Sequence, residues 1–243
     1  MSKIIGITVG TTYDKTKISG GGLTDEQLTQ LETLIKWYEQ AHYTTMTVSI
    51  SPSGKTYELG SKQTLAISWQ FSQEVSSVTF NGEAQEATAK GSKSVTVECS
   101  DPNKSTFTYT VSGTRKDGNK ESKSASCTIL FQNKFYRGYA TDPRSTGGVV
   151  DSAFIRSLQH SGFASGRACS FTQKANSGTY IWYAYPKRFG EATAYMAPPG
   201  SSYMKGGFEA PETVSVTNSS GYTEDYYFYR SINTGLNQDI KMA

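Results

Sequence analysis

The sequence predicts a mainly β fold, with a short N-terminal helix, an immunoglobulin-like sandwich and then a second β-sandwich-like domain. From Thr44 onward, apolar and polar residues alternate with a period of two, which is the period of strands with one buried face. Turn-forming pairs such as Asn81-Gly82 separate the alternating runs. Aromatic residues make up 12% of a chain that is only 36% hydrophobic, as in thin β-layers where rings fill small cores.

Residues 1–22 are predicted to form an extended anchoring arm. Ile5, Ile7 and Val9 alternate as in a strand, but the segment holds too few apolar residues to fold alone. It ends in a triple glycine at residues 20–22, which is typical of a flexible joint. We therefore expect a partner to order this arm.

Residues 23–43 carry the strongest helix signal in the sequence. Thr24 followed by Gln27 is a capping box, in which each side chain accepts a hydrogen bond from the backbone N–H of the other residue. The apolar residues that follow alternate between spacings of three and four, and Leu34 and Trp37 widen this apolar stripe. The segment is therefore predicted to be an amphipathic helix.

The spacing of three and four is also that of a coiled-coil seam. Two heptads are too short to hold a coiled coil alone, so neighbouring domains would have to support one. The alternative is that the helix packs on a β-domain of its own chain. The predicted oligomerisation seam, of a trimer or a dimer, consists of Leu28, Leu31, Ile35 and Tyr38.

Residues 44–132 are predicted to form the immunoglobulin-like sandwich, because short alternating runs separated by turns fill this segment. Trp69 is expected in the core between the two sheets. Cys99 and Cys127 do not fall on the strand pair that carries the usual inter-sheet disulfide, so we expect packed, reduced thiols. The expected strands are 45–51, 63–71, 78–80, 94–99, 106–112 and 122–131.

Residues 133–243 are predicted to form a C-terminal β-rich domain, with a short helix at 151–158 that ends near His160. Aromatic residues fall on both faces of two expected strands, 179–185 and 222–231. A strand that is apolar on both faces is either central in its domain or covered by a neighbouring chain. The other expected strands are 167–173, 204–208 and 212–217.

No motif of an enzyme, a metal site or a cofactor site is found in the sequence. The two histidines, His42 and His160, have no carboxylate or cysteine at ligand spacing. Nucleophile elbows, phosphate-binding loops and dinucleotide fingerprints are absent. We therefore expect no enzymatic activity, no catalytic residue, no metal and no cofactor.

Charge and hydropathy argue against two classes of partner. The formal net charge of +3 is too small and too dispersed to predict nucleic-acid binding. No apolar run approaches the ~20 residues that span a bilayer, and residues 1–6 lack the apolar stretch of a secretory signal. We expect no membrane insertion, and folding in a cytoplasm.

Several aromatic and arginine residues of the C-terminal region are candidates for glycan or subunit contacts. Exposed rings stack on the apolar faces of sugars, and arginines anchor interfaces. Because the rings occur within strand-like runs, the alternative is that they pack the core or a subunit interface. Tyr195 and Tyr203 are further rings that could stack on a sugar. The candidates are Trp182, Tyr183, Tyr185, Arg188, Tyr222 and Arg230.

Three segments carry a resemblance to a known family. They are residues 131–138 (FQNKFYRG), residues 180–190 (YIWYAYPKRFG) and residues 217–231, which begin TNSSGY and end YRS. Over residues 45–243, the chain resembles a family of small virion proteins from phages and prophages of gut Bacteroidetes, crAss-like phages included. Its members are described as tail-fibre, tail-appendage or head-fibre proteins.

The resemblance implies a bacteriophage virion structural protein, a tail-fibre or tail-appendage component made in the host bacterial cytoplasm. Its N-terminal segment would dock on other virion proteins of the tail, the portal-proximal region or the capsid. Its β-domains would be displayed outward, in a homo-oligomer. Two alternatives stay open: a head fibre or capsid decoration protein, and a receptor-recognition module that binds a host surface glycan.

Overall fold

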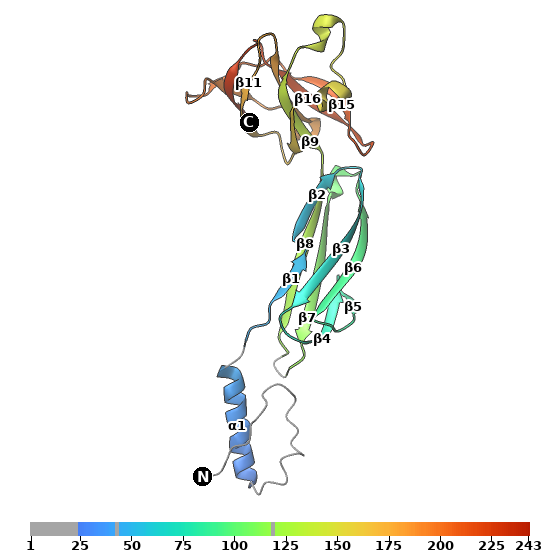
Figure 1. Ribbon diagram of the computed structural model, residues 1–243, viewed down its shortest axis with the longest axis vertical. Helices are drawn as coiled ribbons and strands as arrows, with labels where there is room; N and C mark the ends of the chain where they lie inside the picture. The colour runs from blue at the N-terminus through green and yellow to red at the C-terminus, as the bar shows by residue number, and fades with distance from the viewer. Residues whose placement is uncertain (1–23, 42–43, 118–119) are drawn as a thin grey trace. The chain divides into compact units, whose positions relative to one another are not determined.

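The computed structural model describes residues 24–41, 44–117 and 120–243 of the chain (Figure 1). Strands hold 52% of the described residues and helices 14%, so the predicted mainly β class is confirmed. The predicted arm, 1–22, lies outside the described residues. Contacts divide the chain into two compact units, one within 1–50, 68–92 and 110–126, the other with 51–67, 93–109 and 127–243.

Helix α1 spans Asp25–Ala41 in the first unit. Its predicted capping box is confirmed, because the Thr24 N–H donates to Gln27 Oε1 at 2.9 Å and the Gln27 N–H donates to Thr24 Oγ1 at 3.3 Å. Asp25 and Glu26 place negative charge in the first turn, where the helix dipole favours it. The helix thus begins where its local sequence predicts.

Residues 48–132 form two sheets, with strand orders β1-β3-β6 and β2-β8-β7-β4-β5 (Figure 1). Burial alternates along the long strands, as the two-residue period predicts. The strands are β1 (Val48–Ser51), β2 (Gly54–Glu58), β3 (Lys62–Phe71), β4 (Val75–Phe80), β5 (Glu83–Gln85), β6 (Lys90–Glu98), β7 (Thr106–Arg115) and β8 (Ser122–Gln132).

In the first unit, aromatic side chains pack the two sheets together. Trp69 of β3 is only 6% exposed, and its ring centroid lies 5.9 Å from that of Phe80 on the other sheet. Phe71 lies over Gly113 of β7, where an added Cβ would come within 2.5 Å of the ring. The prediction that Trp69 belongs to the inter-sheet core is confirmed.

The turns of the sandwich are partly those that the sequence predicts. Asn81 and Gly82 join β4 to β5 with φ angles of 50° and 84°, in the left-handed region that these two residue types tolerate. Gly54 begins β2, which pairs in parallel with β8. Strands β2 and β5 were not predicted, because residues 54–58 and 83–85 contain few apolar residues.

Residues 134–242 lie in the second unit and form two further sheets, β10-β9-β12-β16-β15 and β11-β17-β13-β14, with a short helix, α2 (Ser152–Arg156). The strands are β9 (Lys134–Ala140), β10 (His160–Phe163), β11 (Cys169–Lys174), β12 (Tyr180–Pro186), β13 (Ala194–Ala197), β14 (Met204–Lys205), β15 (Glu212–Thr217), β16 (Thr223–Arg230) and β17 (Asn237–Met242).

The five-stranded sheet of this region is buried on both faces. On one face, Tyr183 and Tyr185 of β12 pack in a cluster with Ile240 of the four-stranded sheet. On the other face, Trp182 packs in a cluster with Ile155 of α2. Strand β12 is therefore apolar on both sides because it is central in its own domain, which is one of the two explanations that the sequence left open.

The structure corrects the interpretation of His160. This residue begins strand β10 and pairs with Arg137 of β9, whereas the sequence predicted the end of a helix there. Strands β9, β13 and β17 were also not predicted. Strand β17 has only Ile240 and Met242 as buried apolar residues, so its sequence does not stand out from a loop.

The three cysteines are free thiols in the structure. Cys99 and Cys127 are buried, and Cys169 is half-buried. Burial raises the pKa of the Cys127 and Cys169 thiols, which keeps them protonated and poorly nucleophilic at neutral pH. Their environment is that of packing residues.

Candidate functional site

Helix α1 carries the most exposed aromatic ring of the described residues. Leu34 is 59% exposed, Trp37 is 63% exposed and Tyr38 is 45% exposed. Trp37 and Tyr38 follow Leu34 by three and four positions, so the three side chains lie along one side of the helix. Grouped apolar side chains on a helix are typical of a surface that meets a partner.

The predicted oligomerisation seam lies next to this exposed group. Leu28, Leu31 and Ile35 are half-buried, and Tyr38 belongs to both sets. The greatest exposure is thus found at Leu34 and Trp37, beside the seam. It stays a prediction that this seam joins copies of the chain.

Three of the candidate contact residues are in the core. Trp182, Tyr183 and Tyr185 are 0%, 1% and 0% exposed. Their polar atoms bond within the chain: Trp182 Nε1 donates to the Ala140 carbonyl at 3.1 Å, and the Tyr185 hydroxyl donates to the Gly190 carbonyl at 2.8 Å. The proposed glycan or subunit contacts of these three rings are therefore withdrawn, because no ring face is open.

Arg230 is also engaged within the second unit. Its guanidinium forms ion pairs with Asp142 and Glu209 and lies 4.5 Å from the ring centroid of Tyr180. Arg144 joins the same network, with contacts of 2.8 Å to Asp142. The hydrogen bonds from Arg144 and Arg230 hold the pKa of the Asp142 carboxyl below its usual range.

Arg188 and Tyr222, the remaining two candidates, make contacts inside the second unit as well. Arg188 forms an ion pair with Glu224, which also accepts a hydrogen bond from Asn133. Tyr222 is half-buried and packs against the cluster that contains Leu59. Both residues thus have structural partners in their own chain.

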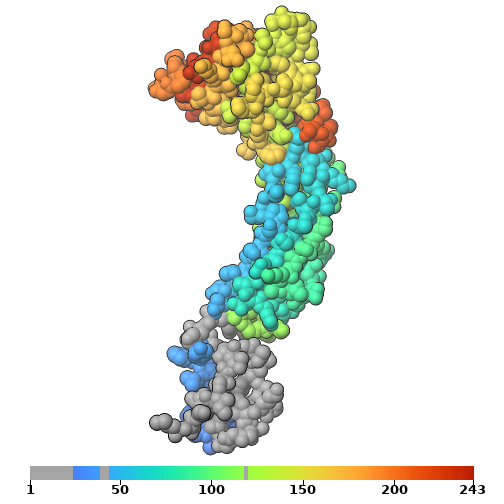
Figure 2. Space-filling model, in the orientation of Figure 1, coloured from blue at the N-terminus to red at the C-terminus, as the bar shows by residue number. Residues whose placement is uncertain are grey.

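A row of side chains lies on the outer face of the four-stranded sheet, and of its members the sequence singled out Tyr195 alone. The strand register sets Ser170, Lys241, Tyr195 and Lys205 opposite one another across β11, β17, β13 and β14. Met196, the neighbour of Tyr195, points into the core, so the alternation of the strand turns Tyr195 outward. The row as a whole could not be predicted because β13 and β17 were not predicted. The segments that hold these two strands, coloured orange to dark red, are at the surface in Figure 2.

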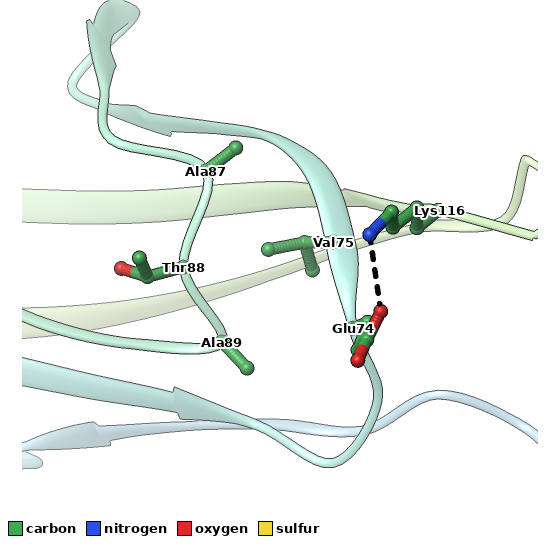
Figure 3. Close-up of a pocket in the computed structure, with 6 residues that line it drawn as sticks. All are labelled: Glu74, Val75, Ala87, Thr88, Ala89 and Lys116. Carbon is green, nitrogen blue, oxygen red and sulfur yellow. Dashed lines mark hydrogen bonds and ion pairs between the residues drawn. The ribbon is translucent and has the colours of Figure 1, made fainter.

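A shallow hollow of about 270 Å³ in the first unit is lined by Glu74, Val75, Ala87, Thr88, Ala89 and Lys116 (Figure 3). Its polar groups have partners in the chain. Lys116 Nζ lies 3.3 Å from Glu74 Oε2, and Thr88 Oγ1 donates to the Lys90 carbonyl at 2.7 Å. Small-molecule sites combine an apolar lining with polar groups aimed at a ligand, and here the polar groups are already engaged.

Within the described ranges, no group of three or more His, Cys, Asp and Glu side chains could hold a metal ion. Among the helices that the structure describes, none is long and apolar enough to cross a bilayer. No protein-family model and no curated protein matches the sequence. The candidate sites therefore rest on the geometry of this chain alone.

Proposed function

We propose that this chain is a structural protein of a bacteriophage virion, a tail-fibre or tail-appendage component. Residues 1–43 attach it to the particle and join copies, and the β-regions are displayed. The observation that carries this proposal is the group of exposed apolar side chains on α1, Leu34, Trp37 and Tyr38. Fully burying a large apolar side chain stabilises by roughly 1.5–3 kcal/mol, before the entropic cost of association is subtracted.

The contacts of the C-terminal region support a structural role. Its large rings fill two cores, and Arg188 and Arg230 pair with carboxylates of the same unit. The large rings and these two arginines thus stabilise the fold of the C-terminal region. This is the arrangement expected of a module whose task is to remain folded on a particle surface.

The assembly that we propose is a homo-oligomer, a trimer or a dimer, formed around α1. Leu28, Leu31 and Ile35 supply the seam, and Leu34 and Trp37 extend the apolar surface toward a second copy or a virion protein. Short coiled coils need support from flanking contacts. A particle-bound fibre supplies such support through its repeated copies.

The test is incorporation into particles. Virions assembled with the full chain, or with a chain that starts at Thr44, are purified and probed with an antibody against the C-terminal region. The full chain should be present and the shortened chain absent, although both fold. Equal incorporation of the shortened chain would contradict attachment through residues 1–43, and absence of the full chain would contradict the virion role. Immunogold labelling of the head would favour the alternative of a head fibre or decoration protein.

A further inference from the structure

We propose that the outer face of the four-stranded sheet, β11-β17-β13-β14, binds an acidic polysaccharide. Tyr195 stacks on a sugar ring, and Lys241 and Lys205 on either side pair with carboxylates of the polymer. This inference deepens the display role by naming the chemistry of the ligand, and it rests on the proposed function for its biological setting. Of the residues in this site, the sequence suggested Tyr195 alone, as one of several rings that could stack on a sugar.

The register of the sheet builds the site. Tyr195 of β13 is directly opposite Lys241 of β17 on one side and Lys205 of β14 on the other. Directly opposite residues of antiparallel strands have Cβ atoms ~4.5–5.5 Å apart, so the three side chains span about 10 Å. A half-buried ring therefore has an exposed lysine on each side.

The opposite face of the same sheet packs into the core. Met196 and Ile240 alternate with Tyr195 and Lys241 along β13 and β17, and both belong to the buried cluster that joins the two sheets. The outer face is partly open: Ser170, Lys205 and Lys241 are exposed and Tyr195 is half-buried, whereas Ala197 on the same face is buried. The remaining outward residues include Ser170, whose hydroxyl can donate to and accept from a sugar.

The charge of this face suits an anion. Lys174, Lys205 and Lys241 are exposed on it, and none of them forms an ion pair with another described residue. The carboxylate on the face, Asp239, is held by the chain, since it accepts from Thr172 Oγ1 at 2.5 Å and from a backbone N–H of the β13–β14 loop at 3.3 Å. These bonds from neutral donors leave the charge of Asp239 in place, and the four strands of the sheet hold three lysines against this one carboxylate.

The distribution of charge along the sequence points the same way. Residues 133–243 contain 11 lysines and arginines against 8 aspartates and glutamates, so the whole net charge of +3 falls in this region. Arginines such as Arg144, Arg188 and Arg230 are paired within the chain. The three lysines of the sheet face are among the basic side chains that carry the excess positive charge of this region.

The mixture of groups favours a sugar polymer over other anions. Nucleic-acid surfaces need many more basic residues to track phosphates, and a protein interface needs a larger apolar centre. A ring that is partly open to solvent covers the C–H face of a sugar, while ammonium groups and hydroxyls bind its carboxylates and hydroxyls. The row Ser170, Lys241, Tyr195 and Lys205 has this combination.

The experiment is calorimetric titration of the full-length protein with polygalacturonate and hyaluronate oligosaccharides, at about 50 mM and about 200 mM salt. Saturable binding that weakens at the higher salt concentration is expected with at least one of these polymers. Dextran, which has sugar rings but no charge, should not bind. Polyglutamate and duplex DNA, which have charge but no uronate, should bind at least about tenfold more weakly.

Point variants locate the site. Tyr195→Ala should lower the affinity about tenfold, while Tyr195→Phe should keep it, because the ring remains. Lys205→Gln and Lys241→Gln should each lower it about threefold and reduce the salt dependence. Lys62→Gln, on an exposed position of β3, removes the same charge elsewhere and should change nothing.

Three outcomes would overturn the proposal: no saturable binding to either uronate polymer, equal binding of polyglutamate or DNA, or an unchanged affinity in Tyr195→Ala. Thermal unfolding of each variant confirms that it is folded. Light scattering of the same samples reports the oligomeric state independently. A failure of the sugar site is thereby separated from a failure of the assembly role of α1.

Discussion

The side-chain amide of Asn218 donates a 2.7 Å hydrogen bond to the backbone carbonyl of Leu59, a residue 159 positions earlier in the chain. The Asn218 side chain is buried, and its Oδ1 accepts from the backbone N–H groups of Ser220 and Tyr222, at 2.9 and 3.0 Å. All four residues belong to the second unit. One asparagine thus shapes the β15–β16 turn and ties it to the segment that follows β2.

Asn218→Ala should lower the free energy of unfolding by about 2–4 kcal/mol, because it removes three hydrogen bonds and leaves a buried carbonyl unpaired. Urea unfolding of the full chain measures this loss. Asn233→Ala, at an exposed position, is the matched control and should shift stability by less than about 0.5 kcal/mol. Equal stability of the Asn218→Ala protein and the parent would contradict the structural role of this bond.

Gly113→Ala should destabilise the sandwich by about 1–3 kcal/mol, because the new Cβ would lie 2.5 Å from the Phe71 ring. Gly166→Ala is the control, since no heavy atom lies within 4 Å of a Cβ added there. Adding Phe71→Leu to Gly113→Ala should recover part of the loss relative to the two single variants. Strict additivity in that double-mutant cycle would show that the ring is not the cause.

Asp142→Asn should flatten the acid limb of the stability curve. The pKa of Asp142 is lowered chiefly by hydrogen bonds from Arg144, with Arg230 adding to the effect. A carboxyl with a lowered folded-state pKa stabilises the protein above its unfolded pKa of about 3.9, and that contribution is lost as the pH falls through the folded-state value. Urea unfolding between pH ~2 and ~7 checks the slope, with Glu86→Gln as an exposed control. An acid limb as steep as that of the parent would argue against this pairing.

Local signals predicted the parts of the fold that depend on neighbouring residues. The Thr24–Gln27 capping box and the Asn81-Gly82 turn use contacts a few residues apart. Trp69 was assigned to the core because a large ring on an alternating strand has few other places to go. Strands such as β17 were missed, because their pairing with β11 and β13 is non-local and their own apolar residues are few.

The candidate site was predicted less well, since burial cannot be read from residue type. Trp182 and Tyr185 are equally suited to a sugar surface and to a core, and only the covering of both faces of β12 decides between them. The row around Tyr195 depends on the register of three short strands. That register is set by tertiary packing, and no spacing in the sequence reveals it.

Replacing the exposed apolar residues of α1 should weaken association of the chain. Leu34→Ser combined with Trp37→Ser removes large exposed side chains and leaves the buried core unchanged. The protein should therefore stay folded, while the oligomer should dissociate at a higher protein concentration than the parent. Lys36→Ser, on the same helix, is the matched control and should leave association unchanged. Sedimentation velocity measures the shift, and identical association of the double variant and the control would exclude this surface as the contact.

The most direct test of the account is the mass of the full-length protein by light scattering, beside a chain that starts at Thr44. Assembly through α1 predicts a dimer or trimer of the 26.5 kDa chain, and a monomer once residues 1–43 are removed. A full-length protein that remains at 26.5 kDa at high concentration would contradict assembly through α1.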